Sequence, residues 1–165
     1  MQLETDIVDW RVPESGDDWY VLAERAAQAA MAVAPELANS RLLTSLLFTY
    51  DSEIHALNHE WRDRDKPTNV LSFPMLERDE LLALAPEGPP VMLGDIALAR
   101  ETCEREASAK GISLEHHTAH LIVHGLLHLA GHDHVDSDAQ AEAMEALEIA
   151  ALAKLGIADP YEDRN

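Results

Sequence analysis

Residues 117–134 read HTAHLIVHGLLHLAGHDH, and this stretch sets the expectations for the rest of the chain. A helix turns about 100° per residue, so the four-residue step from His124 to His128 places both imidazoles on one helical face. Gly131 can adopt the left-handed conformation that ends a helix, which would let the chain fold back and bring His134 over that face. Three imidazoles with one open position are typical of a catalytic zinc site.

Composition favours a metal site over a chance cluster. Six of the nine histidines lie in this stretch, among leucine, isoleucine and valine side chains. Buried rings without partners would be costly, and a shared metal removes that cost. The prediction is one Zn²⁺ per chain, held by His124, His128 and His134. Sites of three imidazoles also accept nickel, cobalt or iron, so the pattern leaves the metal open.

The other polar residues near these ligands allow more than one interpretation. His120 lies one turn before His124 on the same face, and we expect it to support a ligand or the core rather than to bind metal. Asp133 could orient a ligand histidine, or simply cap the turn. His116 and His117 lie near the start of the helix and are expected to be solvated or hydrogen-bonded.

Length and cysteine content narrow the class of protein. The chain has 165 residues, enough to bury a proper core, so we expect one domain over residues 1–165. Its single cysteine, Cys103, excludes a disulfide framework and a cysteine-based zinc site. The acidic N-terminal residues lack the features of a signal peptide, and no apolar run is long enough to cross a bilayer. We therefore expect a cytoplasmic protein with no membrane partner.

The net charge of −19 argues against a nucleic-acid partner unless a local cationic patch exists. The tight basic cluster before the histidine stretch consists of Arg62, Arg64 and Lys66. These cations alternate with Asp63 and Asp65, so the pattern by itself favours a solvated, salt-bridged turn.

Hydrophobic periodicity predicts strands and helices in mixed order along the chain. Strands are expected at residues 2–9, 42–50, 70–73 and 93–99, and helices at 17–34, from 51 or 52 to about 61, at 100–110, from 113 through the histidine stretch, and at 137–155. Residues 78–92 are Pro-rich and acidic, and we expect them to form a loop or a hairpin extension.

Four motifs in order resemble the YbeY family of single-strand-specific endoribonucleases, which are also described as rRNA maturation factors. They are LNHEWRDRDKPTNVLSFP at 57–74, LGDIALA at 93–99, HGLLHLAGHDH at 124–134, and AMEALE with KLGIADPY between 143 and 161. The resemblance covers well over half of the chain. His132 is a departure, because many members have Tyr there; it is either neutral or an alternative metal contact.

The resemblance implies a small α/β (α+β) fold, in which helices flank a four-stranded mixed sheet and zinc lies on a helix-turn near one end of the sheet. It implies His124, His128 and His134 as the ligands and Arg62 as a residue needed for cleavage. Lys66 is a weaker candidate for contact with a substrate phosphate. The implied role is maturation of ribosomal RNA, particularly at the small-subunit 3′ end, and ribosome quality control. Ribosomal RNA, ribosomal particles and associated proteins are then the expected partners, and DNA is not.

Two other classes of function remain open at this point. The spacing HxxxHxxGxxH is that of metzincin proteases, but those enzymes carry a Glu general base where this chain has Gly125. The other class is a non-catalytic, zinc-containing factor that binds ribosomes, which the acidic composition would suit. For a ribonuclease, the pattern does not decide whether a metal-bound hydroxide or the substrate 2′-OH attacks phosphorus.

Overall fold

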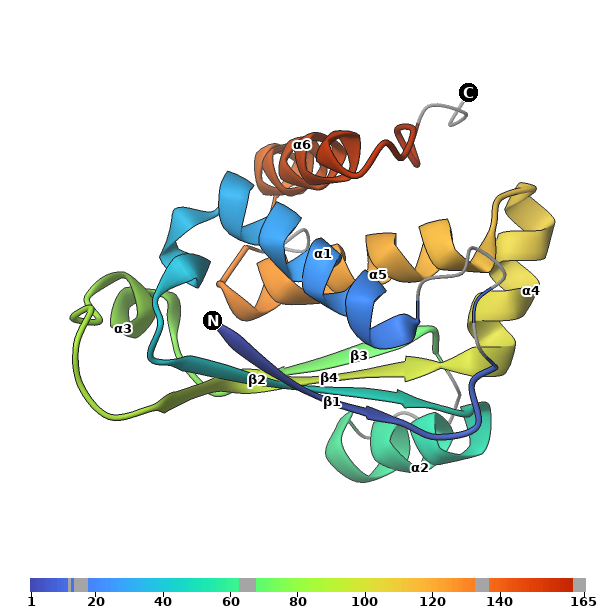
Figure 1. Cartoon of the computed structure of the whole chain (residues 1–165), viewed down its shortest axis with the longest axis horizontal. Helices are drawn as coiled ribbons and strands as arrows, with labels where there is room; N and C mark the ends of the chain where they lie inside the picture. Colours follow the sequence, from blue (N-terminus) through green and yellow to red (C-terminus); the bar gives the residue numbers. More distant parts are fainter. Residues whose placement is uncertain (12, 14–17, 63–67, 133–136, 162–165) are drawn as a thin grey trace.

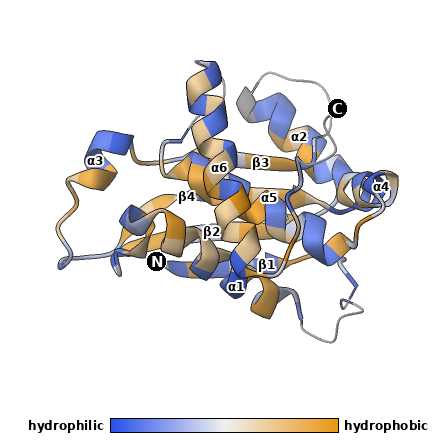
Figure 2. Ribbon diagram, turned by 90° about the horizontal axis from the view of Figure 1, so that it is seen from above, coloured by the Kyte–Doolittle hydropathy of each residue, from blue (hydrophilic) through white to orange (hydrophobic). Residues whose placement is uncertain are grey.

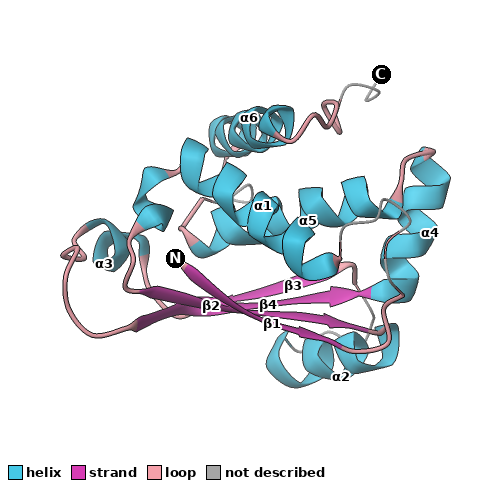
Figure 3. Ribbon diagram, in the orientation of Figure 1, coloured by secondary structure: helices cyan, strands magenta, loops and turns pink. Residues whose placement is uncertain are grey.

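Four strands form one mixed sheet in the order β1-β2-β4-β3 (Figure 1, Figure 3). This computed structural model describes residues 1–11, 13, 18–62, 68–132 and 137–161, with backbone only at Trp61 and Arg62. Strands β1 (Gln2–Ile7), β2 (Leu42–Thr49) and β4 (Val91–Ala99) are parallel, and β3 (Val70–Pro74) runs antiparallel to β4 at the edge. The predicted α/β fold with a four-stranded mixed sheet is confirmed.

Helices cover both faces of the sheet (Figure 1). On one face lie α1 (Trp19–Val33) and α5 (Leu114–Leu129), and α6 (Asp138–Lys154) packs on these two helices. On the other face lies α2 (Asp51–Arg62). The remaining helices are the 3-10 helix η1 (Pro35–Ala38), α3 (Arg78–Leu82) and α4 (Arg100–Lys110), which follows β4 directly.

Strand β2 contributes side chains to two hydrophobic cores of unequal size, one on each face of the sheet. Leu42, Leu46 and Phe48 point into the large core beneath α1 and α5, whereas Leu47 packs with the smaller cluster around Ile54 of α2. Side chains alternate between the faces of a strand, so one apolar strand can serve both cores. Figure 2 shows the result: β2, β3 and β4 are mostly hydrophobic, while α4 is largely hydrophilic.

Helix α5 approaches the sheet closely at Gly125. A Cβ atom placed on this glycine would lie 3.0 Å from Ile96 Cδ1 of β4, so the missing side chain lets the helix pack against the strand. A glutamate here would press against Ile96. The general base of the metzincin proteases is therefore absent from the sequence, and this tightly packed position does not favour it.

The prediction for residues 78–92 was partly wrong. Residues Arg78–Leu82 form α3, and β4 begins at Val91 rather than at Leu93. The reason is a capping box built from glutamates: Glu77 caps the helix, and its backbone N–H donates to Glu80 Oε1 at 3.1 Å. Within the described ranges, no helix combines the length and apolar character needed to cross a membrane.

Candidate metal centre

Helix α5 begins and ends as the sequence predicts. Ser113 caps its first turn, and Gly131 follows its last turn with a left-handed φ of +93°. The N–H of Gly131 donates to the His128 carbonyl, and the N–H of His132 donates to the Leu127 carbonyl, both at 3.0 Å. This pair of bonds is the Schellman motif, which closes a helix and reverses the chain.

His124 and His128 interrupt an otherwise buried segment of α5. Within residues 118–130, every residue is buried except these two, which are partly exposed. They lie four residues apart and therefore share one face of α5. The helix thus presents two imidazoles together toward solvent, at the spacing that a metal ion needs.

A buried carboxylate holds the first of these rings. Glu148 of α6 is fully buried, and its Oε1 hydrogen-bonds with Nδ1 of His124. An ionised carboxylate accepts, so the Nδ1 atom of His124 carries the proton, and Nε2 of this ring is left available as a ligand. A carboxylate behind a histidine is the usual way in which proteins orient a metal-binding imidazole.

Two further groups meet the same carboxylate. The hydroxyl of Tyr161 donates to Oε2 of Glu148, and Nε2 of His120 lies 3.5 Å from that oxygen. Burial alone would raise the pKa of Glu148, but the hydrogen bonds from His120, His124 and Tyr161 outweigh it and lower the pKa to about 2. Glu148 is therefore ionised at neutral pH. The expected supporting role of His120 agrees with this contact.

Strand β3 holds the second ring. Oγ of Ser72 lies 2.6 Å from Nδ1 of His128, a hydrogen bond between the edge strand and α5. A His128 that binds metal through Nε2 would donate its Nδ1–H to this hydroxyl. Both candidate ligands are thus held at Nδ1 by oxygen atoms from other elements, which leaves Nε2 of each ring available.

The start of α5 carries a second chain of hydrogen-bonded polar side chains. His117 is buried, and its Nε2 lies 2.9 Å from Oε1 of Glu106 in α4. The same oxygen accepts from the Asn69 side chain at 2.9 Å. Asn69 immediately precedes β3, so this chain of bonds fixes β3 and α4 to the first turns of α5. The expectation that His117 is hydrogen-bonded is confirmed.

His132 contacts a carboxylate from outside the histidine stretch. Its Nε2 lies 3.3 Å from Oε1 of Glu36 in η1. Two of the predicted site residues next to it, Asp133 and His134, lie outside the described residues. Within the described part of the chain, no group of three His, Cys, Asp or Glu side chains has the arrangement of a metal site. The two ligands that can be compared with the prediction, His124 and His128, do share a face.

The predicted cationic residues are only partly covered by the structure. Arg62 is the last residue of α2, and its side chain lies outside the described part. Lys66 also lies outside it. Helix α2 lies on one face of the sheet, and α5, which carries the histidines, lies on the other (Figure 1).

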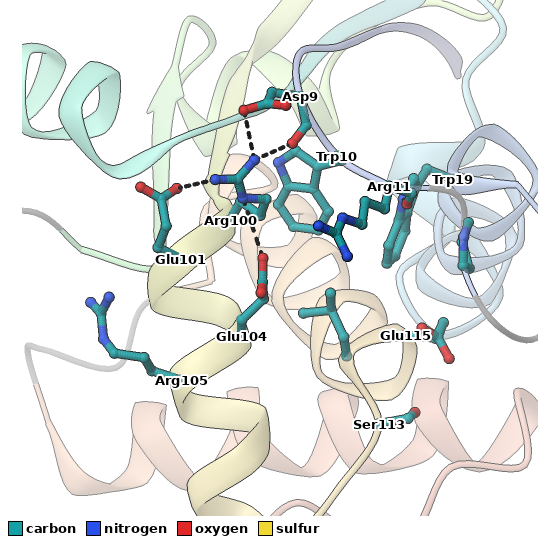
Figure 4. Close-up of a pocket in the computed structure, with 12 residues that line it drawn as sticks. Asp9, Trp10, Arg11, Trp19, Arg100, Glu101, Glu104, Arg105, Ser113 and Glu115 are labelled. Atoms are coloured by element: carbon teal, nitrogen blue, oxygen red, sulfur yellow. Dashed lines mark hydrogen bonds and ion pairs between the residues drawn. The ribbon is translucent and has the colours of Figure 1, made fainter.

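A separate cavity lies at the other end of α5. It has a volume of about 860 Å³ and is lined by the loop after β1 and by the starts of α4 and α5 (Figure 4). Arg100 lies in its wall and donates to the backbone carbonyl and the carboxylate of Asp9, at 2.5 and 2.7 Å. Ten helical residues, about 15 Å, separate Leu114 in this cavity from His124. Arg100 here fastens the β1 loop to α4.

Glu148 was not predicted as a site residue, although the sequence of α6 contains a signal for it. The buried residues of α6 are Met144, Glu148, Ala151 and Leu152, which recur at helical spacing. A glutamate at an apolar position of such a stripe must have partners, since a lone buried carboxylate is very costly. Ser72 and Tyr161 give no comparable signal, because a serine in a strand and a tyrosine after a helix are common.

The fold and these contacts define a small α/β protein that presents two oriented imidazoles on one helix. Comparison with known proteins identifies the group. Residues 15–156 match the family model described as Endoribonuclease YbeY. The chain is 70% identical over 164 residues to "Endoribonuclease YbeY" of Erythrobacter litoralis, covering 99% of each, and 60% identical over 152 residues to that of Novosphingobium aromaticivorans, covering 90% and 91%. The chain belongs to the Endoribonuclease YbeY family.

A solved structure agrees with the fold. The solution structure of a Thermotoga maritima protein matches with a TM-score of 0.58 and 22% identity, over 98% of this chain and 95% of that one. Membership of the family makes the chain an endoribonuclease, an enzyme that cuts RNA internally. The endoribonuclease therefore replaces the two other interpretations, a metzincin protease and a non-catalytic factor that binds ribosomes.

Proposed function

We propose that this endoribonuclease uses one zinc ion, held by His124, His128 and His134, to cleave single-stranded RNA. The observation that carries the proposal is the pair of half-exposed imidazoles on α5, each held at Nδ1 by an oxygen atom. Imidazole nitrogens suit zinc, and an outer carboxylate raises the basicity of its histidine. The donor set therefore fits the metal. A bound zinc ion supplies Lewis-acid chemistry and a water with a pKa of about 7.

The chain's own residues would hold and neutralise the substrate. Arg62 has paired N–H donors for the negative charge that gathers on the phosphoryl oxygens, and Lys66 would contact a backbone phosphate. Support comes from connectivity, because the segment that follows Arg62 leads into β3, whose Ser72 bonds His128. The strand that follows this segment therefore contacts the helix that carries the histidines.

The biological substrate that we propose is ribosomal RNA, with cleavage during small-subunit 3′-end maturation and a role in ribosome quality control. The partners would be ribosomal particles and associated proteins, rather than DNA or membranes.

Cys103 is buried, and burial raises the pKa of its thiol to about 12. One unreactive thiol suits a reducing cytoplasm. The domain would span residues 1–165, since β1 lies before the family match yet pairs with β2.

The test is an RNA cleavage assay combined with elemental analysis. Wild-type protein should contain about one zinc per chain and cut a labelled single-stranded RNA, and a chelator should stop the cleavage. His128→Ala should lose both metal and activity. His116→Ala is the matched control, because His116 is an exposed histidine of the same helix. A metal-free wild-type protein with full activity would refute the proposal, and casein serves as the control for proteolysis.

Arg62 and the attacking group are tested in the same assay. Arg62→Ala should abolish cleavage while the zinc content stays at the wild-type level, and wild-type activity in this variant would return Arg62 to a solvated turn. The product ends identify the nucleophile, because a 2′,3′-cyclic phosphate requires attack by the substrate 2′-OH.

A further inference from the structure

Arg78 contacts the end of the histidine helix from a distant part of the sequence. It is the first residue of α3, and its Nη1 donates to the backbone carbonyl of Ala130 at 2.6 Å. Ala130 is the C-cap residue of α5, where helix carbonyls lack partners within the helix and carry partial negative charge. A guanidinium is well suited to this position, because it is always charged and forms hydrogen bonds of fixed geometry.

The next two residues of the turn meet the same group of side chains. A Cβ atom on Gly131 would lie 2.7 Å from Cβ of Arg78, so the Arg78 stem lies directly against the glycine. His132 reaches Glu36 at 3.3 Å, and Glu36 also pairs with Nη1 of Arg78 at 3.3 Å. Three consecutive residues after α5 are thus held by Arg78 and Glu36, which we call the exit clamp.

The exit clamp fixes the direction in which the chain leaves α5. His134 follows His132 by two residues, so any freedom in this turn would spread the positions of the third imidazole. Metal ligands must be held to within about 0.5 Å for tight binding. The Schellman bonds fix the backbone of the turn, while the exit clamp ties the turn to η1 and α3.

We propose that Arg78 is a positioning residue of the metal site, which acts with Glu36 by orienting residues 130–132, from which the chain continues to His134. The proposal rests on the proposed zinc site. It assigns a function to α3 and η1, two short elements remote from the histidines in sequence. It also gives His132 a place in the clamp, bonded to Glu36 rather than serving as an alternative metal contact.

The test compares zinc affinities. Arg78→Met keeps the length of the stem and removes the donors, and its affinity for Zn²⁺ is measured by competition with a chromophoric chelator. We expect binding about 10-fold weaker than wild type, the lower end of what outer-shell substitutions cost. Arg78→Lys should fall between the two. Arg41→Met is the matched control, because Arg41 donates to the carbonyls of Ala85 and Pro89 and does not contact α5.

A purely structural role would lower the melting temperature and leave the metal site of the folded protein unchanged. The visible absorption of bound Co²⁺ separates these cases, since it reports ligand geometry, and we expect it to change in Arg78→Met but not in Arg41→Met. Should Arg78→Met fail to fold, Glu36→Gln keeps the shape of the clamp and should weaken zinc binding several-fold. A folded clamp variant with the wild-type zinc affinity and the wild-type Co²⁺ spectrum would overturn the positioning role of Arg78 and leave the proposed function standing. A wild-type protein that binds no zinc would overturn the proposed function as well.

Discussion

Glu148 is a single residue on which both the packing of α6 and the orientation of His124 depend. It accepts hydrogen bonds inside the core, and its low pKa keeps it charged there. Glu148→Gln keeps the size of the side chain but loses the charge that fixes the His124 proton. We expect zinc affinity to fall about 10- to 100-fold while the protein still folds. Chelator competition measures this, with exposed Glu142→Gln as the control. Equal affinities in the two variants would contradict it.

His117 gives a residue-scale prediction about pH. Burial lowers the pKa of its ring below the ordinary 6.5, and the hydrogen bond to Glu106 offsets this only in part. The unfolded chain therefore takes up a proton near pH 6.5 that the folded chain does not, so stability present above that pH is lost as the pH falls. The low pKa of Glu106 acts in the same direction, but only below its ordinary value of 4.5.

The measurement is urea unfolding at about pH 7.5 and 5.5. The free energy of unfolding should fall on acidification, and His117→Gln should reduce that fall by up to about 1.4 kcal/mol, the value for one proton over one pH unit. His59→Gln is the control, because its side chain is exposed. The same pH dependence in His117→Gln as in wild type would show that the ring is not held neutral.

At the scale of elements, the sequence predicted the features that depend on interactions between residues close together in the chain. The apolar run of β2, the cap at Ser113 and the reversal at Gly131 were all predictable, because alternation, capping and left-handed glycine act within a few residues. Helix α3 was missed because its glutamate cap departs from the usual serine or threonine. Glu148 and Ser72 were missed as ring partners because tertiary packing brings them to the histidines from other elements.

The end of α5 allows a matched comparison of two glycines. Gly131 and Gly111 both end a helix with positive φ, +93° and +69°, but a Cβ on Gly111 would meet nothing within 4 Å. Gly111→Ala should therefore cost only the left-handed backbone, about 1–2 kcal/mol. Gly131→Ala should cost more, because the methyl group also pushes against Arg78. Urea unfolding measures the difference, and we expect only Gly131→Ala to weaken zinc binding. An equal loss of unfolding free energy in the two variants would mean that the Arg78 side chain moves aside without cost.

At the scale of the whole molecule, charge limits what the active site can reach. The chain has 31 acidic residues and 12 lysines and arginines, giving a net charge of −19. Two acidic side chains of α6, Asp138 and Glu142, are exposed. A polyanion such as RNA is repelled at long range by this field, and few cations are available to release its counterions. We therefore expect the enzyme to favour RNA that comes with compensating positive charge, which proteins bound to the RNA can supply.

This field predicts a preference for RNA within ribosomal particles. At about 0.15 M salt, kcat/KM for a precursor RNA in a small-subunit particle should exceed that for the same RNA without proteins by ~10-fold or more, the range over which surface fields change association rates. Neutralising two exposed acids of α6, in the variant Asp138→Asn with Glu142→Gln, should speed cleavage of protein-free RNA and leave zinc content unchanged. The gain should shrink at high salt, because screening removes the repulsion from the wild type. Efficient cleavage of protein-free RNA by the wild type at every salt concentration would show that the field of the molecule does not select its substrate.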